Sequence, residues 1–192
     1  MIPHIRDFIV RMLPGGILAL LLYFALLPIR RRRLLGAGQA SPLHREILLL
    51  VFSLFCGGMA CITLTPRWFH WITVLRDGAN EPFFQIGTFN LIPFRTFASD
   101  PWSVMILLGN VIMFFPIGFF FVLLWRRNLW KHILLTGLLT TVGIESIQFL
   151  VGRTFDIDDI LLNTIGVLSG GLFCRLLQRF IPTLHTFQLQ NS

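Results

Sequence analysis

The sequence predicts an all-α bundle of about five transmembrane helices. Of the 192 residues, 55% are hydrophobic and only 13% are charged, and the mean hydropathy is +0.75. A soluble domain of this length needs less apolar surface, so a bilayer is the solvent that suits this composition. The apolar residues form long runs without the alternating pattern of a membrane β-barrel. Helices are therefore expected, because they satisfy every backbone hydrogen bond within one segment.

Five apolar runs are long enough, or nearly so, to cross about 30 Å of hydrocarbon at about 1.5 Å per residue. In chain order they are Leu13–Ile29, Ile47–Leu64, Val104–Trp125, Ile133–Val151 and Ile160–Leu177. The first run is the least regular, because Pro14 and two glycines stand at its start. Pro116 lies inside the third run and predicts either a kink that opens a cavity or a simple packing bend.

The charged residues between the runs predict the orientation of the bundle. If the runs alternate in direction, ten basic residues fall on one side, with Glu46 as the only acid among them. These basic residues are Arg30–Arg33, Arg45, Arg126, Arg127, Lys131, Arg175 and Arg179. Because Lys and Arg concentrate in cytoplasmic loops, we expect the N-terminus outside and the C-terminus in the cytoplasm. The net charge of +7 then reflects topology, and we expect no nucleic-acid partner.

This topology divides the chain into four parts. They are two helices with a basic cytoplasmic loop (1–65), an extracytoplasmic loop (66–103), three further helices (104–180) and a cytoplasmic tail (181–192). The outer loop is long for a helix connection. It contains N-L-I-P-F-R, residues 90–95, in which Pro93 excludes an unbroken helix. We expect a short interfacial helix or a re-entrant turn there.

Polar residues of three runs converge at one depth. Glu145 and Gln148 share a face near the outer end of the fourth run, and Glu145 lies roughly 9 Å below that end. Asn110 lies at about the same depth, roughly 9 Å, in the third run. Asp159 and Asn163 share a face of the fifth run with two glycines, at the spacing i, i+4, i+7 and i+11. The three runs therefore point polar groups toward one outward-facing region.

Two interpretations of this region stay open. It is either a binding or catalytic site, or a network of hydrogen bonds that only joins helices. In both, Glu145 faces the bundle interior, because a carboxylate in lipid is costly, and is either protonated or paired with Arg153 or Arg95. Glu145 is the candidate catalytic residue. The candidate substrate-binding residues are Asn90, Arg95, Asn110, Gln148, Arg153, Asp156, Asp159 and Asn163.

The D-I-D-D stretch, residues 156–159, has three possible roles. It caps the fifth helix at its N-terminus, binds a head group or another polar ligand, or holds a divalent ion. The full calcium-binding loop is absent from the sequence, so we expect no metal and no cofactor.

Gly166 and Gly170 form G-x-x-x-G, which predicts close helix packing, as do Gly57 and Gly58. Three cysteines inside apolar runs are expected to be buried small hydrophobes. They are Cys56, Cys61 and Cys174.

Several motifs together resemble the VanZ-like family. They are N-L-I-P-F, G-N-V-I-M-F-F-P-I-G, E-S-I-Q-F and G-R-T-F-D-I-D-D-I-L-L-N-T-I-G, which follow one another between Asn90 and Gly171. The resemblance implies a small multi-pass protein of the bacterial plasma membrane, and the family's namesake is linked to resistance to teicoplanin, a lipid-tailed glycopeptide antibiotic.

The resemblance supplies no mechanism, so three functions stay open. The leading one is an envelope factor that lowers susceptibility to lipoglycopeptides by binding or masking a component at the outer leaflet. The second is a membrane enzyme that acts on a lipid-linked envelope substrate, with Glu145 as general acid or base and Arg153 binding phosphate. The third is a structural scaffold. The expected partners are membrane lipids and either a lipid-linked envelope precursor or a lipoglycopeptide.

Overall fold

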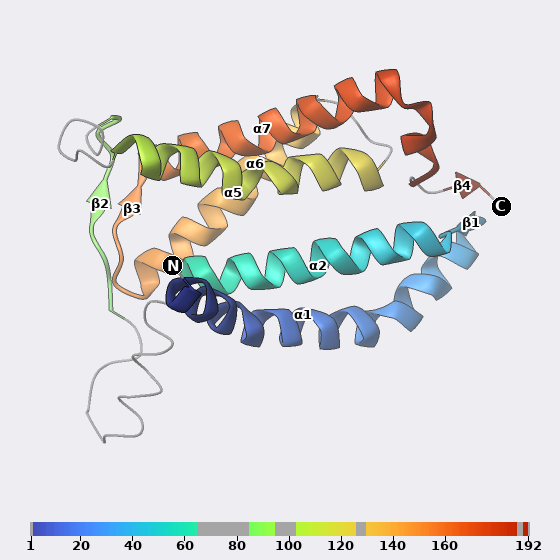
Figure 1. Ribbon diagram of the computed structural model, residues 1–192, viewed down its shortest axis with the longest axis horizontal. Helices are drawn as coiled ribbons and strands as arrows, with labels where there is room; N and C mark the ends of the chain where they lie inside the picture. The colour runs from blue at the N-terminus through green and yellow to red at the C-terminus, as the bar shows by residue number, and fades with distance from the viewer. Residues whose placement is uncertain (1, 65–84, 95–102, 126–129, 188–189, 192) are drawn as a thin grey trace.

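Five long helices make up most of the computed structural model, which describes residues 2–64, 85–94, 103–125, 130–187 and 190–191 (Figure 1). The helices are α1 (Ile2–Gly36), α2 (Leu43–Leu64), α5 (Ser103–Leu124), α6 (Trp130–Leu150) and α7 (Ile157–Phe180). All five are long and apolar enough to cross a membrane, which confirms the predicted fold class. The orientation of the termini stays a prediction.

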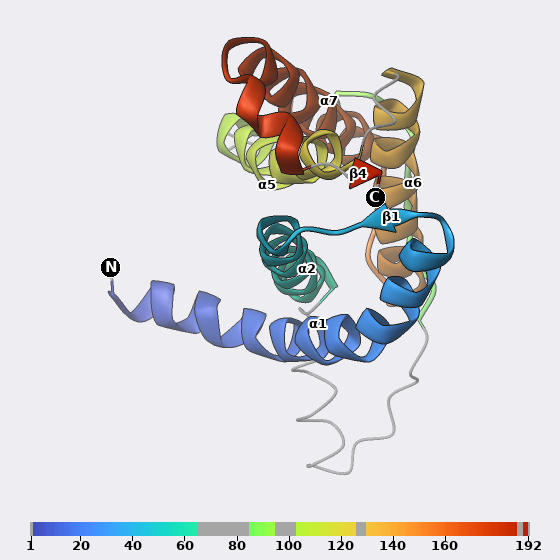
Figure 2. The ribbon, with the colours of Figure 1, turned by 90° about the vertical axis from the view of Figure 1, so that its right-hand side faces the viewer.

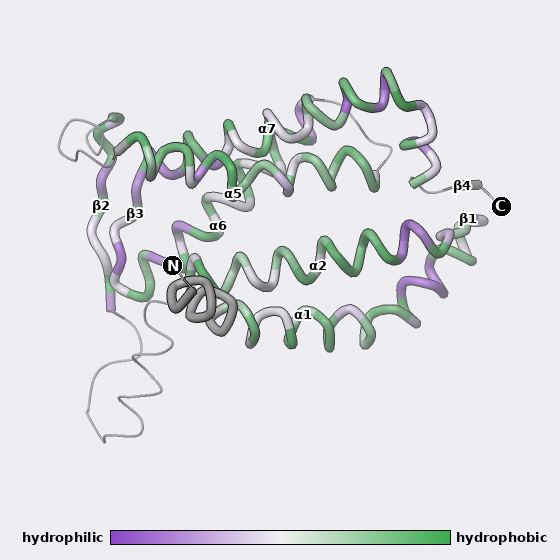
Figure 3. The backbone as a smooth tube through the Cα atoms, in the orientation of Figure 1, coloured by the Kyte–Doolittle hydropathy of each residue, from purple (hydrophilic) through white to green (hydrophobic). Residues whose placement is uncertain are grey.

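The helices form two packed groups. α1 packs against α2, and α5 and α7 lie side by side with α6 packed against α7, while α2 contacts both α5 and α6 (Figures 1 and 2). The hydrophobic core lies among α5, α6 and α7, where Phe114, Ile133 and Val167 are almost completely buried. Polar segments gather at the two ends of the bundle (Figure 3), as expected for helices whose middles face hydrocarbon.

Glycines let the backbones of paired helices touch. A Cβ added to Gly170 would lie 1.9 Å from the carbonyl oxygen of Phe115 in α5, and one added to Gly166 would lie 2.5 Å from that of Val111. This contact confirms the packing role predicted for G-x-x-x-G. Gly57 of α2 makes the same close approach to α1, where an added Cβ would lie 2.3 Å from the carbonyl oxygen of Gly15.

Two short strand pairs connect the helix ends, and neither was predicted. β2 (Phe89–Asn90) runs parallel to β3 (Phe155–Asp156), and β1 (Gln39–Ala40) pairs antiparallel with β4 (Gln190–Asn191). A 3-10 helix, η1 (Pro182–Phe187), follows α7. Within the described residues 85–94 of the outer loop the chain forms β2 and then a turn. Of the two expected forms, the interfacial helix does not occur there, and the re-entrant turn stays a prediction. Most of that loop lies outside the described residues.

The cysteines differ in burial. Cys174 is fully buried in the core, as expected, whereas Cys56 and Cys61 are only partly buried on α2. The expectation of three buried cysteines was therefore wrong for two of them. Cys61 lies at the α1–α2 contact, where its sulfur is 2.7 Å from where a Cβ of Gly15 would lie.

Candidate functional site

The polar region predicted from the sequence lies where the chain passes from α6 to α7. Residues 85–90 run along this connection: the N–H of Gly87 donates to the carbonyl of Phe149 at 2.9 Å, and the N–H of Phe155 donates to that of Thr88 at 2.8 Å. A Cβ on Gly87 would lie 1.7 Å from the carbonyl oxygen of Arg153, so only glycine allows this approach. The outer loop is thereby held at the start of α7 (Figure 1).

Asp156 organises the start of α7. Its side chain caps the helix by accepting the N–H of Asp158 at 2.9 Å, which confirms the predicted capping role. Its other carboxylate oxygen accepts the Asn90 amide at 3.0 Å, and its own N–H donates to Glu145 Oε2 at 3.0 Å. One residue therefore links β2, α6 and α7, and the cap satisfies a donor that the helix itself leaves free.

Asp158 fixes the turn that follows β2. Its side chain is buried, at 3% exposure, and accepts the N–H of Phe94 at 2.6 Å. Phe94 has a φ of 65°, a left-handed conformation that costs free energy in a bulky residue. A charge-assisted hydrogen bond of this kind is stronger than a neutral one, so Asp158 stabilises a strained turn inside the N-L-I-P-F motif.

Asp159 joins α7 to α5. Its carboxylate accepts the side-chain amide of Asn110 at 2.7 Å, and the two glycines of the G-x-x-x-G motif lie farther along α7 against the same helix. The predicted polar face of α7 is thus confirmed as the face that packs on α5. Asn163 is buried, at 4% exposure. Its Oδ1 has no hydrogen-bond partner among the described residues.

Glu145 faces the interior of the bundle, as predicted, and its side chain is among the largest that are fully buried. Among the described residues, no cation pairs with it. Arg153, one of the two expected partners, makes no direct ion pair with Glu145, although its charge still acts on the carboxylate. Arg153 Nη1 instead donates to the carbonyl of Thr63 at 2.8 Å, and Gln148 Nε2 donates to the same oxygen at 2.9 Å. Both donors satisfy one of the carbonyls that the end of α2 leaves free. Arg95, the other predicted partner, lies outside the described residues.

Further unpaired polar atoms lie along α6 and α7. Thr141 Oγ1 and Thr164 Oγ1 are buried without a hydrogen-bond partner among the described residues, like the Oδ1 of Asn163. Thr141 is one turn from Glu145 on α6 and is completely buried. Buried polar atoms are ordinarily satisfied by protein or water, so these atoms have unused capacity to bind a hydroxyl, an amine or water.

The structure brings together most of the predicted site residues that it describes. Contacts are shown for Asn90, Asn110, Glu145, Gln148, Arg153, Asp156 and Asp159, whereas Asn163 is buried on α7 without a described contact to the others. Sequence reasoning assigned no specific contact to Asp158, although the D-I-D-D stretch singled it out, and it missed Thr63, whose contribution is a backbone carbonyl. Within the described ranges, no group of three or more His, Cys, Asp or Glu side chains could hold a metal ion.

A sequence model of the VanZ/LLP1 family matches residues 47–178. The matched region contains nearly all of α2, the site and almost all of α7. No curated protein and no solved structure matches the chain.

Proposed function

The chain belongs to the VanZ/LLP1 family, and from that premise we propose that it binds a polar, lipid-linked component of the cell envelope at the region around Glu145 and Asp156. By doing so it lowers susceptibility to teicoplanin-type lipoglycopeptides. The orientation predicted from the loop charges places this region at the outer leaflet of a bacterial plasma membrane. A ligand would reach this region from the extracytoplasmic side.

The observation that carries this proposal is the state of Glu145. A buried carboxylate without a direct ion pair is costly, and such groups in membrane helices generally have a functional role. Glu145 receives a backbone N–H from Asp156 at 3.0 Å. The unpaired oxygen of Thr141 lies on the same helix, α6, and that of Asn163 lies on α7. These oxygens can accept hydrogen bonds from a ligand with hydroxyl or amine groups.

A second candidate function is catalysis on a lipid-linked substrate. Arg153 is only partly buried and uses one guanidinium nitrogen on the carbonyl of Thr63. The other donors of a guanidinium suit a phosphate group. In this reading Arg153 binds the phosphate, Asp156 and Asp159 position the substrate, and Glu145 transfers a proton to or from it.

The test replaces Glu145 with glutamine and measures two quantities in the same cells: the amount of protein in the membrane and teicoplanin susceptibility. An amide keeps the shape and can still accept the N–H of Asp156. We expect normal abundance with lost protection. Ser146→Ala is the matched control, because Ser146 is exposed and bonds only within its own helix, to the carbonyl of Val142.

Lipid profiles of cells with and without the protein separate the two candidates. A lipid species that appears or disappears with the wild-type protein, but not with Glu145→Gln, supports catalysis. Unchanged lipids with changed antibiotic binding to cells support binding or masking. Full abundance together with full protection in Glu145→Gln would refute both candidates for this carboxylate.

A further inference from the structure

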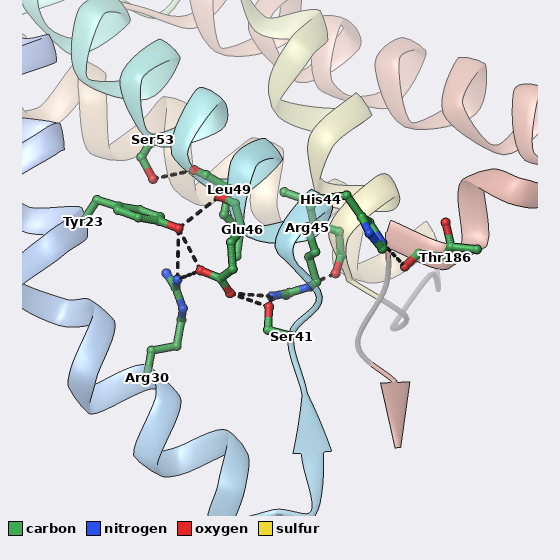
Figure 4. A network of polar contacts seen from close by, with 10 residues as sticks. Tyr23, Arg30, Ser41, His44, Arg45, Glu46, Leu49, Ser53 and Thr186 are labelled. Atoms are coloured by element: carbon green, nitrogen blue, oxygen red, sulfur yellow. Dashed lines mark hydrogen bonds and ion pairs between the residues drawn. The ribbon is translucent and has the colours of Figure 1, made fainter. Parts of the chain in front are cut away.

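The end of the bundle opposite the site contains a second buried carboxylate, that of Glu46. Tyr23 donates its hydroxyl to Glu46 Oε2 at 2.7 Å and to the Glu46 carbonyl at 3.0 Å. Arg30 Nη2 donates to Oε2, and the hydroxyl of Ser41 donates to Oε1. Arg45 Nη1 lies 4.0 Å from Oε1 (Figure 4). Two cations and two hydroxyls therefore surround this carboxylate, which is only 8% exposed.

Because its partners occupy both oxygens, the Glu46 carboxylate cannot also pair with the other basic side chains at that end of the molecule. Glu46 is the only acidic side chain there among the described residues. Arg45 is buried as well, and its Nη2 donates to the carbonyl of Leu124 at the end of α5, at 3.4 Å. Other basic side chains at this end have no described carboxylate to pair with. They are Arg31, Arg32, Arg33, Lys131, Arg175 and Arg179.

Three of these cations form a continuous group on the last turns of α1. Arg31, Arg32 and Arg33 are all exposed. Successive residues of an α-helix point about 100° apart, so with Arg30 turned toward Glu46 the side chains of Arg31 and Arg32 point away from that contact. Arg33 lies closer to the face of Arg30 but is exposed as well. They belong to a helix that is long and apolar enough to span the membrane, and long basic side chains at such helix ends extend to the head-group level.

A second basic group lies where α6 begins and α7 ends. The guanidinium of Arg175 stacks over the ring of Trp130, at 4.6 Å from its centroid. Lys131 and Arg179 are exposed beside them in the sequence. Tryptophan side chains concentrate at the membrane interface, so this pair sets the same end of the bundle at head-group depth.

We infer that the exposed arginines of α1, residues 31–33, bind the head groups of anionic phospholipids. A guanidinium forms paired hydrogen bonds with phosphate oxygens, and basic clusters next to a membrane helix attract anionic lipids. The apolar side chains that precede the arginines on α1 are exposed, Leu26 and Ile29 among them. They can contact the acyl chains of the same lipid, which a free phosphate ion lacks.

The test measures thermal unfolding of the full-length protein in detergent micelles doped with phosphatidylglycerol or with phosphatidylcholine of the same acyl chains. We expect phosphatidylglycerol to raise the midpoint more than phosphatidylcholine does, and glycerol phosphate to have no effect. The variant carrying R31Q, R32Q and R33Q should respond equally to both lipids. Each basic residue near an anionic surface contributes about fivefold to affinity, so the three together account for about 125-fold.

Arg30→Gln is the matched control. It breaks the contact with Glu46, so it should lower the midpoint in both lipids while the preference for phosphatidylglycerol persists. High salt should weaken the preference of the wild type, because exposed charges are screened. Equal responses of the wild type to the two lipids would overturn the inference, as would a full preference in the triple variant. An equal effect of glycerol phosphate would assign the arginines to free anions instead.

Discussion

The contact between α5 and α7 is tested by Gly170→Ala, which adds a single methyl group. The added Cβ would lie 1.9 Å from the carbonyl oxygen of Phe115 and 3.1 Å from the backbone nitrogen of Phe119. Real Cβ atoms essentially never come within 3.0 Å of such atoms, so the helices must separate by about 1.1 Å at this point. The obstacle is backbone, which cannot rotate away as the end of a flexible side chain can.

The expected cost follows from two opposing effects. Forcing extra volume into a packed interface costs about 1–3 kcal/mol, and the close glycine contacts that hold membrane helices together are lost in addition. Alanine recovers up to about 1 kcal/mol through its higher helix propensity. We therefore expect Gly170→Ala to lower the free energy of unfolding by about 2 kcal/mol, which corresponds to about 4–8 °C in the melting temperature of a chain of this size.

Gly143→Ala is the control for this prediction. Gly143 lies on α6, and a Cβ added there meets nothing within 4 Å. The same substitution should therefore leave the melting temperature unchanged or raise it slightly, through helix propensity alone. Both variants are purified in detergent and their melting followed by tryptophan fluorescence. Equal melting temperatures would refute the argument that the backbones of α5 and α7 touch at Gly170.

Three further predictions address topology and the site. In a background without the native cysteines, Thr154→Cys should react with an impermeant thiol reagent from outside intact cells and Leu35→Cys should not; the reverse pattern would invert the topology. Asn110→Leu removes the donor to Asp159 and should cost about 0.5–1.5 kcal/mol in detergent melting, as expected for the loss of one hydrogen bond whose acceptor is partly buried; an unchanged melting temperature would contradict the bond. Phe94→Gly should raise stability by about 1 kcal/mol by relieving a left-handed backbone; a loss would show that the ring contributes more than the strain costs.

The helices could be predicted because their signal is local. Hydropathy marks the apolar stretch, so the first run ended at Ile29, whereas α1 continues to Gly36 through arginines that favour helix. Hydropathy also misplaced the start of α7. This helix begins at Ile157, three residues before the apolar run, because Asp156 caps it. The polar face of α7 was also predictable, since residues at helical spacing share a face wherever the helix packs.

The partners of the site residues were less predictable, because they depend on contacts between distant segments. Arg153 follows Glu145 closely in the sequence, which suggested an ion pair. Its guanidinium instead reaches the carbonyl of Thr63, 90 positions away, because the end of a helix leaves that oxygen free. Backbone acceptors of this kind leave no trace in a residue pattern. The contacts of Glu46 were not predictable for a related reason. Tyr23 lies inside an apolar run, and the basic loop indicates the orientation of the bundle but not which arginine contacts Glu46.

A comparison of the two buried glutamates, Glu46 and Glu145, distinguishes a structural carboxylate from a functional one. Glu46 is surrounded by Arg30, Arg45 and two hydroxyls, whereas Glu145 receives a backbone N–H from Asp156 and no cation among the described residues. Removing one partner of a fully buried ion pair costs about 3–5 kcal/mol. The Arg30 side chain is 28% exposed, so we expect a smaller loss, about 1–3 kcal/mol, for Glu46→Gln.

Glu145→Gln should cost less than about 1 kcal/mol, because the amide oxygen still accepts the same N–H. The two variants therefore make the same chemical change at opposite ends of the bundle, with a large loss of melting temperature expected only for Glu46. If both melt equally early, Glu145 is a structural residue, and any loss of protection in its variant is a folding effect. If only Glu46→Gln melts early while only Glu145→Gln loses protection at normal abundance, the carboxylate of Glu145 acts in function, because its removal leaves the fold intact.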